Sequence, residues 1–121
     1  MSERRRNIIL DFDGVIHSYT SGWKGETVIP DPPVSGVRDA IAKIREHHNV
    51  YVLSTRCSYP EGVQAIKDYL LKHDIVVDDV VTEKVKASLI IDDRAHRFEG
   101  NWEKTAEFVL SADAFKTWMD D

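Results

Sequence analysis

Short aliphatic runs that alternate with segments of helical spacing constrain the fold of this chain more than any other feature. Residues 7–12, 50–53 and 88–91 indicate buried strands. Between them, Val37, Ile41 and Ile44 recur at helical spacing within 34–48, and residues 61–73 repeat this spacing. The alternation predicts an α/β fold in three Rossmann-like layers, with helices on both faces of a parallel sheet.

The remaining segments are less regular. Residues 75–77 and 80–81 predict one or two further short strands. Residues 15–33 combine Tyr19 and Trp23 with alternating polar residues, which favours a hairpin or lid loop over a helix. The tail from Trp102 onward is expected to be mostly helical. At 121 residues with 42% hydrophobic content, we expect a single domain over residues 1–121.

Charge and cysteine content exclude several classes of protein. A net charge of −5 leaves no general basic field for a nucleic-acid backbone, and we interpret the run at residues 4–6 as a solvated tail rather than a phosphate-contacting arm. No segment has the apolar length of a signal peptide or a membrane span, so no membrane contact is expected. Cys57 is the single cysteine, which predicts a reducing, cytoplasmic location.

Polar residues follow each strand at its carboxyl end, which is where open α/β sheets bind ligands. Asp11, Asp13 and Gly14 follow the first strand, and Ser54, Thr55 and Arg56 follow the second. The last strand ends in Asp92-Asp93, and Lys84 lies shortly before that strand. We expect these residues to form one site.

Four carboxylates at one site would repel each other strongly unless a cation lay between them. Oxygen ligands with room for water and a phosphate oxygen predict Mg²⁺, with Asp11, Asp13, Asp92 and Asp93 as the candidate ligands. A zinc site is not expected, because Cys57 stands alone and His47-His48 lacks a partner pair at ligand spacing.

Such a site suits phosphoryl transfer through a covalent intermediate. One carboxylate attacks phosphorus and forms an aspartyl phosphate, while a second carboxylate two residues later exchanges protons with the leaving group and water. Lys84 and the Ser54 hydroxyl would stabilise the oxygens of the transferring group.

The ordered residues Asp11-Phe-Asp13-Gly14-Val15, Ser54, Lys84 and Ile91-Asp92-Asp93 resemble the four motifs of the haloacid dehalogenase-like superfamily. The resemblance covers about residues 7–102 and is closest to small phage-type members without a cap domain. It implies a Rossmann-like fold, Asp11 as nucleophile and Asp13 as general acid/base. It also implies Mg²⁺ held by the Asp11 carboxylate, the Asp13 backbone carbonyl, and Asp92 or Asp93. Because dehalogenases of this family lack the second acid, Asp13 favours phosphate chemistry.

The resemblance leaves the third motif open between two lysines. Lys84 is favoured because its spacing to the Asp pair is similar to a Lys-Pro-x-Ala pattern in phage-type members, although Val85 replaces the proline. Lys86 remains the alternative. Too few residues separate Ser54 from Lys84, or Asp13 from the first helix, for a folded cap domain. The site is therefore expected to be open and suited to phosphates on nucleotides or polynucleotide ends.

Three further side chains are candidates for substrate contact. Arg56 after the second strand is similar to the phosphatase half of polynucleotide kinase-phosphatases, where a guanidinium would bind phosphate; the alternative is a salt bridge to Asp92 or Glu61. Trp23 and Trp102 either stack on a nucleobase or close a hydrophobic rim. Thr55 and Gly14 belong to the same predicted substrate site.

Other functions compete with a hydrolase. A signalling receiver domain shares the length, acidic pair, Mg²⁺, hydroxyl and lysine, but its acceptor Asp would end the mid-chain strand, where Ser54-Thr55 stands here. A non-catalytic phosphate- or nucleotide-binding protein is a second alternative. A phosphotransferase is the third, because its first half-reaction is the same.

Overall fold

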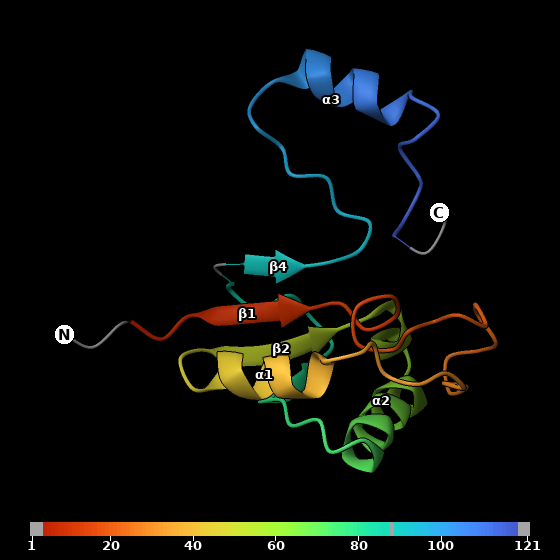
Figure 1. The fold of residues 1–121 in the computed structure, drawn as a ribbon, viewed down its shortest axis with the longest axis vertical. Helices are drawn as coiled ribbons and strands as arrows, with labels where there is room; N and C mark the ends of the chain where they lie inside the picture. Colours follow the sequence, from red (N-terminus) through yellow and green to blue (C-terminus); the bar gives the residue numbers. More distant parts are fainter. Residues whose placement is uncertain (1–3, 88, 119–121) are drawn as a thin grey trace.

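The chain forms a four-stranded, all-parallel sheet with three α-helices, an α/β fold (Figure 1). This computed structural model describes residues 4–87 and 89–118. The sheet order is β3-β2-β1-β4, so the first strand of the chain lies in the interior of the sheet. The elements are β1 Asn7–Leu10, α1 Val37–Arg45, β2 Asn49–Leu53, a 3₁₀ helix Thr55–Ser58, α2 Pro60–Lys72, β3 Asp79–Val81, β4 Leu89–Ile91 and α3 Trp102–Val109.

One hydrophobic core joins three strands to two helices. Ile8 pairs with Val50, and Leu10 pairs with Val52, so these side chains share one face of the sheet. They belong to the same buried cluster as residues of α1 and α2, among them Ile41, Ile66 and Leu70. Both crossover helices therefore pack against this face, as two right-handed crossovers in the same direction require.

Several predicted boundaries are corrected by local chemistry. β1 ends at Leu10 rather than at residue 12, because the Phe12 carbonyl accepts hydrogen bonds from the N–H groups of residues 15–17 in a tight turn. α1 begins after Gly36, whose φ of 83° is left-handed. α2 begins at Pro60, which suits a first helical turn. Residues 75–77 form no strand, and β3 covers only Asp79–Val81.

The carboxyl-terminal part differs from its prediction. The strand was expected to be buried, but Leu89, Ile90 and Ile91 are 53%, 44% and 40% exposed because β4 is an edge strand without a covering helix. Ser88 lies outside the described residues. α3 stands apart from the sheet in Figure 1, buries none of its side chains, and is followed by turns rather than further helix. Helices on both faces of the sheet are therefore not confirmed.

The loop at residues 15–33, called the flap loop below, is not a hairpin. All of its residues are described, and they form turns and only isolated bridges, between residues 13 and 17 and between residues 17 and 33. The flap loop lies beyond the carboxyl ends of the strands (Figure 1). None of the helices in the described ranges has the length and apolar content needed to cross a membrane.

Candidate metal and phosphoryl-transfer site

Three carboxylates from two neighbouring strands meet at the carboxyl edge of the sheet. Oxygens of Asp11, Asp92 and Asp93 all lie within 4.8 Å of one another. The ladder between β1 and β4 explains the convergence, because Leu10 pairs with Ile91 and the Asp11 N–H donates to the Ile91 carbonyl at 2.9 Å. The three acids are called the Asp cluster below.

Burial and mutual repulsion raise the pKa of two members of this cluster, Asp11 and Asp93. Burial, followed by the charges of Asp92 and Asp93, raises the pKa of Asp11 from 3.8 to about 7, although a hydrogen bond from the Phe12 N–H opposes the shift. Burial also raises the pKa of Asp93, against the lowering effect of Arg94. A cation among the three acids would replace protons as the source of compensating charge.

One carboxylate oxygen in the Asp cluster receives no hydrogen bond from a described residue. Among the described residues, Asp93 Oδ1 is buried without a hydrogen-bond partner, and the Arg94 Nε lies 4.0 Å away. A buried carboxylate oxygen that no donor satisfies is costly unless an ion or a water binds it. The three carboxylates therefore fit a hard divalent cation such as Mg²⁺. The cluster also explains Gly14, since a Cβ there would overlap the Asp93 carboxylate.

Asp13, the fourth expected carboxylate ligand, lies outside the Asp cluster and binds two other side chains. Its Oδ2 accepts from Arg56 Nε at 2.9 Å, and its Oδ1 accepts from Arg56 Nη2 at 3.1 Å and from His17 Nδ1 at 2.8 Å. Burial alone would raise the pKa of Asp13, but the hydrogen bonds from His17 and Arg56 outweigh it and lower the pKa. The side chain is thus held as a carboxylate.

His17 is a site residue that the sequence analysis missed. It is fully buried, and its Nε2 accepts from the Asp31 backbone N–H at 3.1 Å, so Nδ1 carries the proton that is donated to Asp13. Asp31 in turn accepts from the Ser21 N–H and hydroxyl, at 2.7 Å and 2.5 Å. The separation of four residues between Asp13 and His17 could have indicated this contact from the sequence.

Arg56 has neither of its predicted roles in this structure. The side chain is 0% exposed and its carboxylate partner is Asp13, not Asp92 or Glu61. Its Nη1 donates to three flap-loop carbonyls, those of residues 25, 26 and 28, at 2.8–3.2 Å. The guanidinium carbon lies 4.6 Å from the Trp23 ring centroid, so the half-exposed Trp23 stacks on Arg56. A buried guanidinium engaged in this way does not face a substrate.

A second missed residue comes from the end of the chain. Trp118 Nε1 donates to the Gly14 carbonyl at 2.8 Å, across 104 residues of sequence. The other candidate stacking residue, Trp102, is 73% exposed on α3 and lies against Phe98 instead. Of the three tryptophans, Trp23 and Trp118 contact the loops at the carboxyl edge of the sheet.

The positions of the remaining predicted site residues follow from the strands and the 3₁₀ helix that lie next to them in the chain. Ser54 ends β2, is buried, and accepts from the Arg56 N–H at 3.2 Å, while Thr55 opens the 3₁₀ helix and is exposed. Lys84 is exposed and follows the carboxyl end of β3 by three residues. The Lys86 carbonyl accepts from Asn7 at the amino end of β1, at 2.9 Å, so its backbone lies at the opposite edge of the sheet. Topology therefore favours Lys84 over Lys86.

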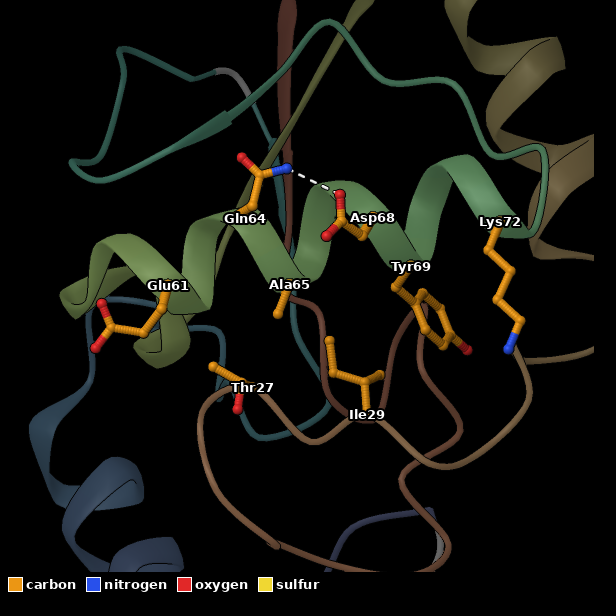
Figure 2. Close-up of a pocket in the computed structure, with 8 residues that line it drawn as sticks. All are labelled: Thr27, Ile29, Glu61, Gln64, Ala65, Asp68, Tyr69 and Lys72. Carbon is orange, nitrogen blue, oxygen red and sulfur yellow. Dashed lines mark hydrogen bonds between the residues drawn. The ribbon is translucent and has the colours of Figure 1, made fainter.

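Two surface grooves lie along α2 and along β4, and neither contains the whole Asp cluster. Figure 2 shows a groove of about 470 Å³ between α2 and the flap loop, with Glu61, Gln64 and Asp68 along the helix. It contains none of the Asp cluster. A second groove of about 570 Å³ runs along β4 and includes Asp92 at one end. We take the Asp cluster as the candidate site, because three carboxylates with a buried unpaired oxygen suit a cation and neither groove has such a set.

No protein-family model, curated protein or solved structure matches this chain. The chemistry of the site is therefore argued from its own residues.

Proposed function

We propose that the chain is a Mg²⁺-dependent phosphohydrolase that forms a covalent intermediate on Asp11. The convergence of Asp11, Asp92 and Asp93 within 4.8 Å carries this proposal. Membership of the haloacid dehalogenase-like superfamily, with its three-layer Rossmann-like fold and without a cap domain, is part of the proposal. It is supported by the order of the four motifs and by the meeting of the first and fourth.

The proposed reaction uses Asp11 twice. In the first half, an Asp11 oxygen attacks phosphorus, the bond to the ester oxygen breaks, and the leaving alkoxide takes a proton from Asp13. Asp13 must be protonated before this step, against the hydrogen bonds from His17 and Arg56 that lower its pKa. In the second half, water attacks the phosphorus of the aspartyl phosphate, its proton passes to Asp13, and Asp11 is restored with release of phosphate. Mg²⁺, held by the Asp cluster, would offset the negative charges of the carboxylates and phosphate.

The surrounding residues would orient and stabilise the transferring group. Ser54 lies at the end of β2, next to β1 in the sheet, and the exposed Lys84 follows β3. A hydroxyl and an ammonium from these strand ends would stabilise the equatorial oxygens of phosphorus. The half-exposed Trp23 and the net charge of −5 suit a nucleotide or a polynucleotide end better than a long nucleic-acid backbone. We propose a cytoplasmic location, since Cys57 is a buried free thiol.

Release of inorganic phosphate from a panel of esters tests the proposal. The panel holds 5′- and 3′-nucleotides, 3′-phosphorylated oligonucleotides and an aryl phosphate, each assayed with MgCl₂ and with EDTA. We expect turnover only with Mg²⁺, and a loss on the order of 10³-fold or more in Asp11→Asn. Asp39→Asn, which removes an exposed carboxylate on α1, is the matched control and should retain full activity. Full activity in Asp11→Asn would refute the nucleophile assignment.

One observation favours a second candidate, a protein that accepts or transfers phosphate without hydrolysing it rapidly. Both oxygens of Asp13 are bound by Arg56 and His17, an arrangement suited to a fixed anion rather than to a proton donor. Rapid-quench measurements with a labelled phosphodonor separate the two candidates. A hydrolase shows continuous phosphate release, whereas a phosphoacceptor shows one equivalent of hydroxylamine-labile phosphoprotein and then no further release.

A further inference from the structure

Several contacts hold the flap loop on the domain, among them the buried side chain of Ile16 and a hydrogen bond from the Tyr69 hydroxyl to the Asp31 carbonyl at 2.9 Å. The largest set of hydrogen bonds, however, runs through the side chain of one proposed catalytic residue, Asp13. Arg56 binds both oxygens of Asp13 and, through Nη1, the carbonyls of residues 25, 26 and 28 in the middle of the loop. His17, near the start of the loop, donates to Asp13 and accepts from Asp31, near the end. The start, middle and end of the loop thus converge on a single carboxylate.

The two side chains that bind the Asp13 carboxylate are buried. Loss of the Asp13 charge would therefore destabilise the hydrogen bonds that hold the loop. Arg56 and His17 are both 0% exposed, and removing one partner of a buried ion pair leaves the other uncompensated. The Arg56 guanidinium is planar and satisfies the carboxylate as a fork while its other nitrogen holds the loop. Trp23 covers that guanidinium from the loop side. The loop cannot lift from the domain without breaking bonds to Arg56 or His17.

We propose that Asp13 is the anchor of the flap loop, with Arg56 and His17 as positioning residues, so that the loop is closed only when Asp13 is in place. The loop is then a lid coupled to the active site rather than a passive surface segment. Coupling of this kind is reciprocal, since whatever opens the loop also frees Asp13 from its orientation. The anchoring is independent of the proposed activity, whereas its effect on turnover rests on the proposed function.

Limited proteolysis measures loop opening without any assay of activity. Lys24 is the only lysine or arginine in the flap loop, and it is exposed, so tryptic cleavage of the Lys24–Gly25 bond, followed by mass spectrometry, reports opening. Asp13→Asn keeps the side-chain volume but removes the charge that binds Arg56. We expect cleavage to rise about tenfold, because charged hydrogen bonds are lost from the closed state.

Asp11→Asn is the matched control. It removes a carboxylate two residues away whose hydrogen bond, among the described residues, comes from the Phe12 N–H rather than from the flap loop, and it should leave the cleavage rate at Lys24 unchanged. Cleavage at the wild-type rate in Asp13→Asn overturns the anchor proposal. Equal acceleration in Asp11→Asn and Asp13→Asn also overturns it, because the loop would then respond to the Asp cluster in general.

Arg56→Lys keeps the proposal testable if Asp13→Asn does not fold. Lysine preserves the buried positive charge but has no planar fork to bind two carboxylate oxygens and three carbonyls together. We expect faster cleavage at Lys24 and, in the phosphatase assay, a fall in kcat with a change in KM of less than about twofold, because Asp13 would be misplaced while phosphate binding remains. Unchanged cleavage overturns the anchor. Faster cleavage with unchanged kcat overturns only the coupling.

Discussion

The two parts of the chain that meet at the Asp cluster are built very differently. Residues 7–81 contain the whole buried cluster of aliphatic and aromatic side chains, together with the buried network around Asp13. Residues 89–118 contribute an exposed edge strand and α3, which buries no side chain. Asp11 and Asp13 belong to the first part, and Asp92 and Asp93 to the second.

Because of this difference, Asp11 is held more firmly than Asp92 and Asp93. The proposed nucleophile, Asp11, follows an interior strand with hydrogen-bonded neighbours on both sides, so its backbone position is fixed by the sheet. The partner carboxylates follow a strand held by one ladder of three pairs. A cation bound among the three acids would therefore also tie the weakly packed part of the chain to the well-packed part.

The largest expected difference in the free energy of unfolding is between shortening a side chain in the core and shortening one in the carboxyl-terminal part. Ile66→Ala removes a fully buried side chain of α2 and should lower the free energy of unfolding by about 2–5 kcal/mol. Leu110→Ala removes a side chain that is 86% exposed and should change it by less than about 0.5 kcal/mol. Urea denaturation followed by circular dichroism measures both. Similar losses in the two variants would mean that α3 packs in solution.

A substitution at Gly14, where residues 7–81 meet Asp93 of the second part, should have the next largest effect. Gly14 has a φ of 84° and is in contact with the Asp93 carboxylate, so Gly14→Ala strains the backbone and displaces Asp93. We expect a loss of about 1–3 kcal/mol in the free energy of unfolding, together with weaker Mg²⁺ binding by titration calorimetry. Gly22→Ala, at a similar φ but with open space around it, is the control for strain alone and should leave Mg²⁺ binding intact.

The pH dependence of stability should report the charge repulsion across the junction. Because burial raises the pKa of Asp11 to about 7, the folded chain binds this proton more tightly than the unfolded chain, whose Asp has a pKa near 3.8. The resulting contribution to stability is complete below about pH 3.8 and is lost as the pH rises toward 7.

Thermal unfolding tests this sign. In EDTA, the Tm of the wild type should fall relative to that of Asp11→Asn between pH 5 and pH 8. With MgCl₂ the wild type should gain Tm, and the gain should be larger at pH 8, because protons compete with the cation at lower pH. A Mg²⁺ effect of equal size at both pH values would contradict the raised pKa of Asp11.

The smallest expected effect concerns α3 alone. Asn101 caps this helix by accepting from the Lys104 N–H at 3.1 Å, and Asn101→Ala should destabilise the helix by about 1 kcal/mol. Since α3 buries no side chain, the global Tm should not move. Hydrogen exchange should become faster in α3 amides only. A matching fall in the global Tm would show that the two parts unfold together.

The sequence predicted what local patterns determine. Aliphatic runs located the four strands, with one false strand at 75–77, and helical spacing located α1 and α2, because these patterns follow directly from strand and helix geometry. A helix in the tail was expected from its residue composition, and α3 covers only part of that tail. The meeting of Asp11 with the pair at 92–93 was also predictable, since parallel strands end at the same edge of a sheet. The burial of β4 was predicted wrongly, because Leu-Ile-Ile has the same composition at an edge as in a covered strand.

The flap loop shows what sequence patterns could not determine. Its glycines, prolines and alternating polar residues indicated a hairpin or a lid loop, and three of its carbonyls bind a distant arginine rather than a second strand. The salt-bridge alternative for Arg56 named Asp92 or Glu61 as the partner, and no pattern of spacing predicts a buried pair with Asp13, 43 residues away. The assignment of Asp13 as acid/base and of Lys84 as the phosphate-stabilising lysine remains a prediction.

The pairing of β4 with β1 makes the site dependent on strand register. Ile8, Ile9 and Leu10 pair with Leu89, Ile90 and Ile91. Hydrogen bonds from Asn7 to the Lys86 carbonyl and from the Asp11 N–H to the Ile91 carbonyl extend this short ladder at its two ends. A slip of two residues would keep every side chain on its own face, yet it would carry the two aspartates about 7 Å along β1. Such a slip would break these few hydrogen bonds, and it would separate the acids that share one cation in the proposed site.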